Sequence, residues 1–497
     1  MFQLKMSAAS CEAECEDFVI NVPLLEPADQ CCESSIVNEA ECEDFVINNI
    51  PPGLPPAEWQ KCCIYRVPKQ LRKVNKEAYA PKLVSIGPFH HHRKELRDME
   101  KHKRGYLEDF LKRTTLKKSQ QDLESIIEAK EEEIRLCYSD DCRLNSKDFV
   151  QMILLDAIFI IELFLKKVAR SKGKKAEEEK DYILSKPWLL NGIYYDLILL
   201  ENQLPFFVLE DLYTSAFNDS SSLSYQQNGQ QIKERQGDLN KEETPFLKLS
   251  RRFFSGYDKQ KKSNIGGEVK HFTDLLRYFF CPPELKSTGQ HYSVYSATKL
   301  DEAGLKFKAF KKDERRLLDI RFPENKCLNK CPCFNLSWLL SCLPCFKCFS
   351  CLERMQYILE VPPFVVDDHT ECLLRNIMAL EQCYYPGNAY ICNYVALLDD
   401  LINTEQDVAL LVDKKVIINL LGSNAVVADL INNLCDEIVL VGSCYSSLAK
   451  KLNYYRDNPW NRNMASMTRV YFRDFWIGTA TVVGLIVLVL TIWNFFK

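Results

Sequence analysis

The sequence predicts a mainly α-helical globular domain with a small β element, followed by one C-terminal transmembrane helix. Apolar residues recur at helical spacing through most of residues 98–458. Strand-like composition is largely confined to Arg316–Phe322 and Ile358–Val366. The run Phe475–Phe496 carries no charged residue. At about 1.5 Å per residue it is long enough to cross a bilayer core of about 30 Å.

Residues 1–58 are predicted to form an acidic disordered arm, because Lys5 is their only basic side chain and a proline-rich run at Pro51–Pro56 closes the segment. The motif EAECEDFVIN occurs twice in this arm, at Glu12–Asn21 and at Glu39–Asn48. Two linked copies of a short motif bind one partner more tightly than one copy does, whereas a neutral tandem duplication leaves the same pattern. The interaction candidates are the apolar residues of each copy, Phe18, Val19, Ile20, Phe45, Val46 and Ile47.

The predicted globular domain spans residues 59–458. Its segment KLVSIGPFHH, which begins at Lys82, predicts a short strand that ends in a turn. Asp98–Arg113 predicts a helix with large apolar residues on one side. A capping box at Ser119 predicts the start of a second helix that continues through Ile134.

Two strongly apolar segments, Asp148–Val168 and Trp188–Leu204, predict core helices, and Pro205 ends the second one. Residues 218–244 are rich in Ser, Gln, Asn and Gly, which is typical of a flexible excursion. The proline pair within Ile358–Val366 confines that segment to a sheet edge or a strand end.

Near the C-terminal end of the domain, a capping box at Thr404 and a cap at Ser423 predict two helices. Gly422 fits a helix C-cap between them. Cys444–Asn458 predicts a further helix that leads toward the apolar run.

Acidic residues within the apolar helices, such as Asp156 and Glu162, are candidates for a buried carboxylate site. These two are six residues apart, about 240° around a helix, so they do not share a face. Structural hydrogen bonding is therefore favoured for them and for Asp196 and Glu201. The histidine run His90–His92 is favoured as a turn, because adjacent side chains do not converge on one ion. No P-loop, nucleophile elbow, zinc-protease or dinucleotide motif occurs, so neither an enzyme nor a cofactor is predicted.

The cysteine-rich stretch 327–353 is the strongest candidate for metal chemistry. Its last four cysteines stand three residues apart and match ferredoxin spacing only in part. Apolar and aromatic neighbours equally suit S-acylated or inert thiols, which are favoured over a metal site. The metal candidates are Cys342, Cys345, Cys348 and Cys351.

The charge distribution predicts the topology. Residues 459–474 are basic and include Arg462, Arg469 and Arg473, whereas only Lys497 follows the apolar run. The positive-inside rule therefore predicts a single-pass tail anchor with a cytosolic body and most of the 22 cysteines reduced. The plasma membrane is the favoured location. A net charge of −4 argues against a nucleic-acid partner.

Several segments in consistent order resemble the plant family called domain of unknown function 247. They are IYRVPKQLR (64–72), YAPKLVSIGPFHH (79–91), MEKHK (99–103), DLILLENQLPFFVLE (196–210), SATKLDEAGLKF (296–307), RNIMALEQC (375–383), INTEQDVALLVDKKVIINLLGSNAVVADLINNL (402–434) and the terminal apolar run.

The resemblance implies a plant membrane protein without an established activity, and some family members lie at grass self-incompatibility loci as recognition components. It supplies no catalytic residues. We therefore expect a membrane-tethered recognition or signalling scaffold with an unidentified protein partner. The alternative is a thiolate-ligated metal or redox protein that uses the Cys342–Cys351 cluster.

Overall fold

The structure is a computed structural model, and it describes residues 61–113, 119–171, 181–217, 243–258, 268–282, 285, 289–310, 316–323, 356–463, 466 and 475–496. Several predicted features lie outside these ranges. They are the arm with Phe18, Val19, Ile20, Phe45, Val46 and Ile47, residues 218–242 of the excursion, the stretch 327–353 with Cys342, Cys345, Cys348 and Cys351, and Arg469 and Arg473.

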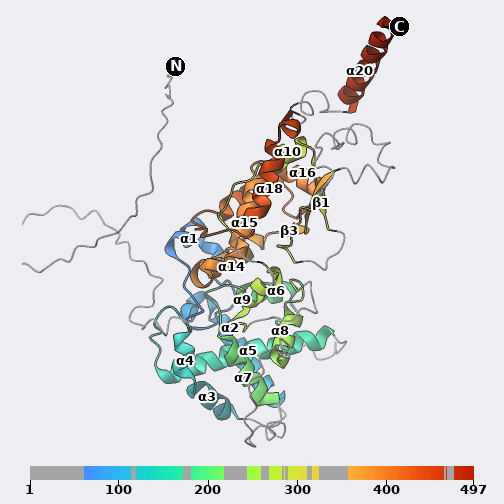
Figure 1. The fold of residues 1–497 in the computed structure, drawn as a ribbon. Coiled ribbons are helices and arrows are strands. Elements are labelled where there is room, and N and C mark those ends of the chain that lie inside the picture. The colour runs from blue at the N-terminus through green and yellow to red at the C-terminus, as the bar shows by residue number, and fades with distance from the viewer. Residues whose placement is uncertain are drawn as a thin grey trace, which may run out of the picture. The chain divides into compact units, whose positions relative to one another are not determined.

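Helix α5 (Ser146–Ser171) is the centre of one group of helices, and it confirms the predicted core helix there. Its side chains are buried almost all round, as expected of a helix enclosed by others. The helices that contact it are α2 (Asp98–Arg113), α3 (Gln120–Glu128), α7 (Phe206–Phe217) and α8 (Pro245–Phe253) (Figure 1).

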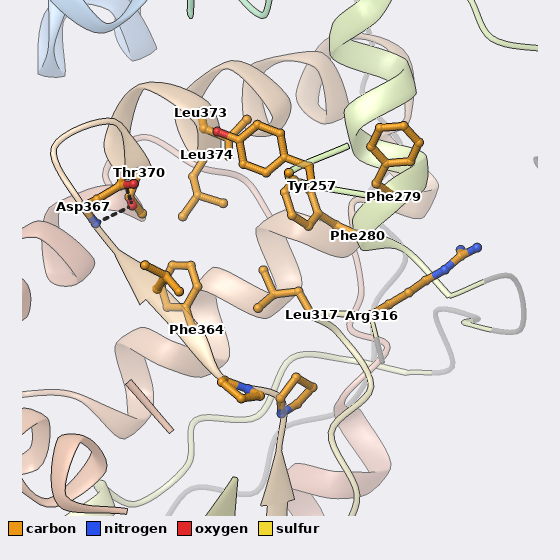
Figure 2. A pocket seen from close by; sticks show the side chains of 14 residues that line it. Tyr257, Phe279, Phe280, Arg316, Leu317, Phe364, Asp367, Thr370, Leu373 and Leu374 are labelled. Carbon is orange, nitrogen blue, oxygen red and sulfur yellow. Dashed lines mark hydrogen bonds between the residues drawn. The ribbon is translucent and has the colours of Figure 1, made fainter. Parts of the chain in front are cut away.

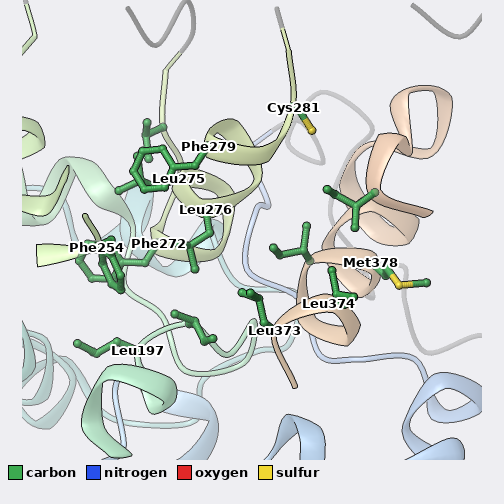
Figure 3. Packing of buried hydrophobic residues seen from close by; sticks show 14 of the residues in the cluster. Leu197, Phe254, Phe272, Leu275, Leu276, Phe279, Cys281, Leu373, Leu374 and Met378 are labelled. Atoms are coloured by element: carbon green, nitrogen blue, oxygen red, sulfur yellow. The ribbon is translucent and has the colours of Figure 1, made fainter. Parts of the chain in front are cut away.

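Helix α14 (Thr370–Tyr384) is the centre of a second group. It contacts α9 (Phe272–Phe280), α15 (Tyr390–Leu401) and α17 (Asn424–Leu434). Figure 3 shows side chains of α9 and α14, among them Leu276 and Leu374, within the same buried cluster. That cluster also includes residues of α5, so one apolar core joins the two groups.

The structure describes further helices and 3-10 turns. They are α1 (Lys69–Val74), α4 (Glu131–Leu136), α6 (Pro187–Asp196), α10 (Ala297–Glu302), α16 (Glu405–Asp413), α18 (Ser446–Asp457), α20 (Phe475–Phe495) and the 3-10 turns η1 (Lys76–Tyr79), η2 (Pro88–His90), η3 (Lys94–Leu96) and η8 (Pro386–Asn388). The capping boxes predicted at Ser119 and Thr404 are both confirmed.

The β element consists of two parallel two-stranded sheets. Strand β1 (Leu305–Ala309) pairs with β2 (Tyr357–Val361), and β3 (Phe364–Val366) pairs with β4 (Ile417–Asn419). The proline pair between β2 and β3 divides the predicted strand in two, because proline lacks the N–H that a continuous ladder requires.

The strand predicted at Lys82 is wrong. The segment from Lys82 to Gly87 runs into the 3-10 turn η2, and side chains rather than a neighbouring strand bind its backbone N–H groups. Asp196 accepts three of them at 2.6–2.9 Å, and Asn202 Oδ1 accepts the N–H of Ile86 at 2.7 Å. These bonds replace the ladder that a strand needs.

The helix predicted at Trp188–Leu204 is too long, because α6 ends at Asp196. The side-chain amides of Asn202 and Gln203 donate hydrogen bonds to carbonyl groups near the end of α6. These bonds satisfy the last carbonyls of the helix and turn the chain back before Pro205.

Three smaller predictions also need correction. The helix starting at the Ser119 cap stops at Glu128, and three glutamates favour a new N-terminus for α4. Arg316–Phe322 is not a strand but a turn in which only Arg321 bridges to Glu360, because β1 is the strand that pairs with β2. Gly422 has φ +84 but follows β4 rather than a helix.

The apolar run at the C-terminus forms α20, and the side chains described in its second half are exposed. Among the residues that the structure describes, no helix combines the length and the apolar content needed to cross a bilayer. The predicted transmembrane helix is therefore not supported by the structure. Of the three predicted juxtamembrane arginines, Arg462 is described, and it is exposed.

Candidate functional site

An apolar cavity of about 150 Å³ lies where α9, α14 and the β2–β3 connection meet. Figure 2 shows aromatic and aliphatic side chains from these elements around it. Its lining residues are Gly256, Tyr257, Phe279, Phe280, Arg316, Leu317, Pro362, Pro363, Phe364, Val365, Asp367, Thr370, Leu373 and Leu374. We call this cavity the Phe364 pocket.

The proline pair and the pleat of β3 place Phe364 in the pocket. Prolines at 362 and 363 end β2 and start the short strand β3, where side chains alternate between the two faces. Phe364 and Val366 are buried, whereas Val365 between them is exposed. Phe364 also packs edge-to-face on Tyr394, with ring centroids 6.0 Å apart.

A hydrogen-bonded turn before α14 sets the direction of the two leucines in the lining. The backbone N–H of Asp367 donates to Thr370 Oγ1, and the Thr370 hydroxyl donates to Asp367 Oδ1, both at 2.9 Å (Figure 2). The N–H of His369 also donates to Asp367 Oδ1. These bonds fix the start of the helix that carries Leu373 and Leu374.

The opposite wall is aromatic. Tyr257 packs edge-to-face on Phe280 at 5.8 Å, and burial raises the pKa of its hydroxyl well above the usual value. The Arg316 guanidinium extends away from the rings in Figure 2 and donates a hydrogen bond to the carbonyl of Cys281. Burial of the guanidinium away from water lowers the pKa of Arg316.

The lining of the pocket is mostly apolar. Its lining, as far as the structure describes it, contains no histidine, cysteine or lysine. The Asp367 carboxylate and the Thr370 hydroxyl in the lining are hydrogen-bonded to each other within the turn before α14. A cavity of about 150 Å³ has room for a group the size of benzene. A phenylalanine or branched aliphatic side chain matches that volume.

The buried acids Asp156, Glu162, Asp196 and Glu201 lie outside this pocket, and each has partners. Asp156 accepts from Lys103 Nζ at 2.5 Å and from the N–H of Gly87 at 2.8 Å. Glu162 pairs with Arg113 at 2.8 Å. Burial raises the pKa of Asp156 to about 6 and also raises the pKa of Glu162. These contacts agree with a structural role.

Asp196 and Glu201 have the same kind of role. Asp196 holds the Lys82–Val84 backbone, and burial raises its pKa to about 6. Glu201 accepts a hydrogen bond from the N–H of Val67 at 2.6 Å, and it forms an ion pair with Arg72. Burial acts to raise the pKa of Glu201, but these partners and His90 outweigh it and lower the pKa.

The histidine run does not converge on one point. His90 is buried with Nε2 3.2 Å from Glu201 Oε2, and burial lowers its pKa. His91 and His92 pack edge-to-face on each other and are more exposed. Within the described ranges no group of three or more His, Cys, Asp or Glu is arranged to hold a metal ion. The four candidate cysteines lie outside those ranges.

Sequence reasoning did not find the Phe364 pocket. Its walls come from segments as far apart as Gly256 and Leu374, and no single motif joins them. The one local signal was the sequence Pro362-Pro363-Phe364, which places an apolar residue directly after a strand break. Convergence of the other lining residues depends on the tertiary packing of α9 against α14.

Comparison with known proteins places the chain among plant sequences. The model of domain of unknown function 247, described as a plant protein of unknown function, matches residues 64–490. The UPF0481 protein At3g47200 of Arabidopsis thaliana is 28% identical over 461 residues, covering 87% of this chain and 85% of the relative. The putative UPF0481 protein At3g02645 of Arabidopsis thaliana is 23% identical over 489 residues, covering 86% and 88%. No solved structure matches the chain.

Proposed function

The chain belongs to the plant protein family of domain of unknown function 247, and on this premise we propose that it is a non-enzymatic recognition or signalling scaffold tethered to a membrane. The observation that carries the proposal is the Phe364 pocket, a mostly apolar cavity lined by aromatic and aliphatic side chains. The pocket accepts one aromatic or branched side chain of a protein partner.

The surface beside the pocket supports a protein partner. Val365 lines the pocket, and in the parallel register it lies opposite Ile418 on the same face of the β3–β4 sheet. Val365, Ile418 and Leu420 are 39%, 41% and 63% exposed. An apolar patch beside a cavity is typical of an interaction surface.

One inserted side chain is an anchor and not a complete interface. Burying a phenylalanine or leucine side chain contributes about 1.5–3 kcal/mol. Immobilising two proteins costs more than that, so the surrounding patch has to supply the rest. The expected interface therefore has an apolar anchor in the Phe364 pocket and further contacts on the outer face of β3–β4.

Copurification from native plant membranes tests the scaffold role. The full-length chain is compared with Gly256→Leu and with Gly387→Leu, because an added Cβ meets nothing within 4 Å at either glycine. Gly256 lines the pocket, whereas Gly387 lies in an exposed turn outside it. We expect Gly256→Leu, which adds a bulky side chain to the pocket lining, to abolish a reproducible partner that Gly387→Leu retains. Equal recovery with both variants contradicts the proposal.

Binding of benzene to the purified chain tests the pocket directly. We expect saturable binding to the wild type and to Gly387→Leu, and its loss in Gly256→Leu. If benzene binds Gly256→Leu as well as it binds the wild type, the Phe364 pocket is not the anchor site. Structural integrity of the three proteins is compared by circular dichroism.

Membrane tethering is the second part of the proposal and rests on the charge-free run Phe475–Phe496 and the basic residues before it. Alkaline carbonate extraction of plant membranes tests it. The full-length chain should stay in the pellet, and a chain that ends at Asp474 should be released. Release of both chains would contradict membrane anchoring through residues 475–496. A self-incompatibility role is the narrower form of the proposal that the family resemblance suggests.

The alternative function remains a thiolate-ligated metal or redox site at Cys342, Cys345, Cys348 and Cys351, which stand three residues apart. Zinc or iron at one equivalent per chain, lost on Cys345→Ser, supports it. Purified protein without either metal removes it.

A further inference from the structure

A second and larger cavity, of about 410 Å³, is lined by a different face of the α14 N-terminus. We propose that it binds an arginine side chain of a protein partner. The lining combines aromatic rings with carboxylates and comes from η1, the Lys82 segment, α6 and α14. It consists of Asn75, Glu77, Ala78, Ala80, Lys82, Leu83, Trp188, Gly192, Tyr195, Asp196, Leu199, Asp368, His369, Glu371 and Cys372. We call it the Trp188 pocket.

The aromatic part of the pocket offers flat faces to a ligand. Trp188 lies in the first turn of α6 and is 64% exposed, although a tryptophan side chain is usually withdrawn from water. Tyr195 and His369 stack on each other, with ring centroids 3.5 Å apart and an interplanar angle of 20°. Guanidinium groups stack on such faces and are held by the ring quadrupole.

The charge of the lining favours a cation. Four carboxylates and one lysine line the pocket. Arg375 pairs with one of the carboxylates, Glu371, at 2.8 Å. Together these groups leave an excess of two negative charges. Burial lowers the pKa of His369, so the imidazole adds no positive charge near neutral pH.

Two carboxylates in the lining remain available to a ligand. Asp196 is committed to the backbone of residues 82–84, and Glu371 is committed to Arg375 and Asn75. Glu77 and Asp368 make no ion pair among the residues that the structure describes, and both are exposed. A guanidinium between an aromatic face and a carboxylate combines stacking with charge-assisted hydrogen bonds.

Size and shape separate arginine from other cations. A bare metal ion is far smaller than 410 Å³, and the described residues hold no metal-ligating group of three or more His, Cys, Asp or Glu. A lysine ammonium is compact and strongly hydrated, whereas the planar guanidinium is weakly hydrated and suits stacked sites. The cavity also has room for the aliphatic stem of an arginine side chain.

The inference goes beyond the scaffold role and does not depend on the Phe364 pocket. The two pockets use different residues, since Thr370, Leu373 and Leu374 line the first and His369, Glu371 and Cys372 line the second. A partner segment with an apolar and a basic side chain would engage both faces of α14.

Titration of the full-length protein with N-acetyl-arginine amide tests the proposal, with the uncharged isostere N-acetyl-citrulline amide as the control ligand. We expect saturable binding of the arginine amide and at least about tenfold weaker binding of the citrulline amide, because only the former is charged. Binding should also weaken as salt is raised. Equal affinity for the two ligands overturns the proposal.

Two variants locate the site. Trp188→Ala should weaken binding about three- to thirtyfold, the range of a cation–π contact, and Asp368→Asn should weaken it about threefold or more. Trp188 is mostly exposed, so its truncation leaves the core intact. The matched controls are Trp460→Ala, at another exposed tryptophan, and Glu132→Gln, at an exposed acid far along the chain.

Each result has a defined meaning. Unchanged affinity in Trp188→Ala, or equal losses in the Trp460→Ala control, overturns the proposal. Gly256→Leu should leave arginine binding unchanged, because Gly256 lines the Phe364 pocket and not the Trp188 pocket. If Gly256→Leu loses the copurified partner but still binds the arginine amide, both sites are supported. If no partner copurifies at all, the arginine titration still tests the Trp188 pocket.

Discussion

Lys103 Nζ lies 2.5 Å from Asp156 Oδ1, and the two side chains are 0% and 2% exposed. The ammonium also donates to Glu100 at 2.6 Å and to the Ser85 carbonyl at 2.6 Å. Burial acts to lower the pKa of Lys103, but the two carboxylates outweigh it and raise the pKa. The pair joins α2 to α5, the central helix of its group.

Replacing Lys103 by methionine should lower the free energy of unfolding by about 3–5 kcal/mol, because a buried carboxylate then lacks its cation. Urea denaturation followed by circular dichroism measures the loss. Lys101→Met, at an exposed position on the same helix, should stay within about 0.5 kcal/mol of the wild type. Further substitution of Asp156 by leucine should recover part of the loss, and no recovery would argue against an uncompensated charge.

Replacing Asp196 by alanine should free three backbone N–H groups of the Lys82–Val84 segment. The Val84 N–H is buried, and an unpaired buried N–H costs about 1–3 kcal/mol, so a loss in that range is expected. Hydrogen exchange should become faster at these amides before it does so elsewhere. Asp429→Ala, at an exposed position on α17, is the control. Unchanged exchange at residues 82–84 contradicts the assigned contact.

Acid should destabilise the protein through His271, which is fully buried. Its Nε2 lies 3.0 Å from the Cys63 carbonyl, and burial lowers its pKa from 6.5 to about 3. The unfolded state therefore binds the proton at a higher pH than the folded state does. The contribution of His271 is fully present above pH 6.5 and is lost as pH falls toward 3, by about 1.4 kcal/mol per unit.

Comparison with His271→Gln isolates this contribution, because glutamine does not titrate. The wild type should lose its stability advantage over the variant as pH falls from about 7 to 4 in urea denaturation series. A difference between the two proteins that stays constant with pH would show that His271 is not buried in its neutral form.

Substitution of Gly87 by alanine should lower the free energy of unfolding by about 2 kcal/mol or more. The residue has φ +70 and ψ −173, a conformation that is essentially confined to glycine. An added Cβ would also lie 2.6 Å from the Gln203 carbonyl oxygen. Gly256→Ala meets no atom within 4 Å and should be close to neutral in the same thermal or urea denaturation. Equal effects at both glycines would contradict the local strain.

The sequence predicted the elements whose signal is local. The Asp98–Arg113 helix, the capping boxes at Ser119 and Thr404 and the core helix around Asp156 follow from spacing and side-chain hydrogen bonding within a few residues. It also predicted that the buried acids are structural, because acids on different helix faces do not form one site.

Predictions failed where a side chain distant in the sequence determines the backbone conformation. The Lys82 segment has the alternation of a strand, but Asp196 and Asn202 bind its N–H groups from more than a hundred residues away. β1 and β4 were missed because short parallel strands depend on partners brought in by the fold.

The sequence by itself determined the mainly helical class, the positions of the strongest caps and the order of family motifs, because each depends on residues close together in the chain. Only the tertiary structure decided where α6 ends, how Lys103 and Asp156 pair, and which side chains surround the Phe364 and Trp188 pockets. Cavities form between elements, so their walls are set by packing across long sequence separations rather than by any local pattern.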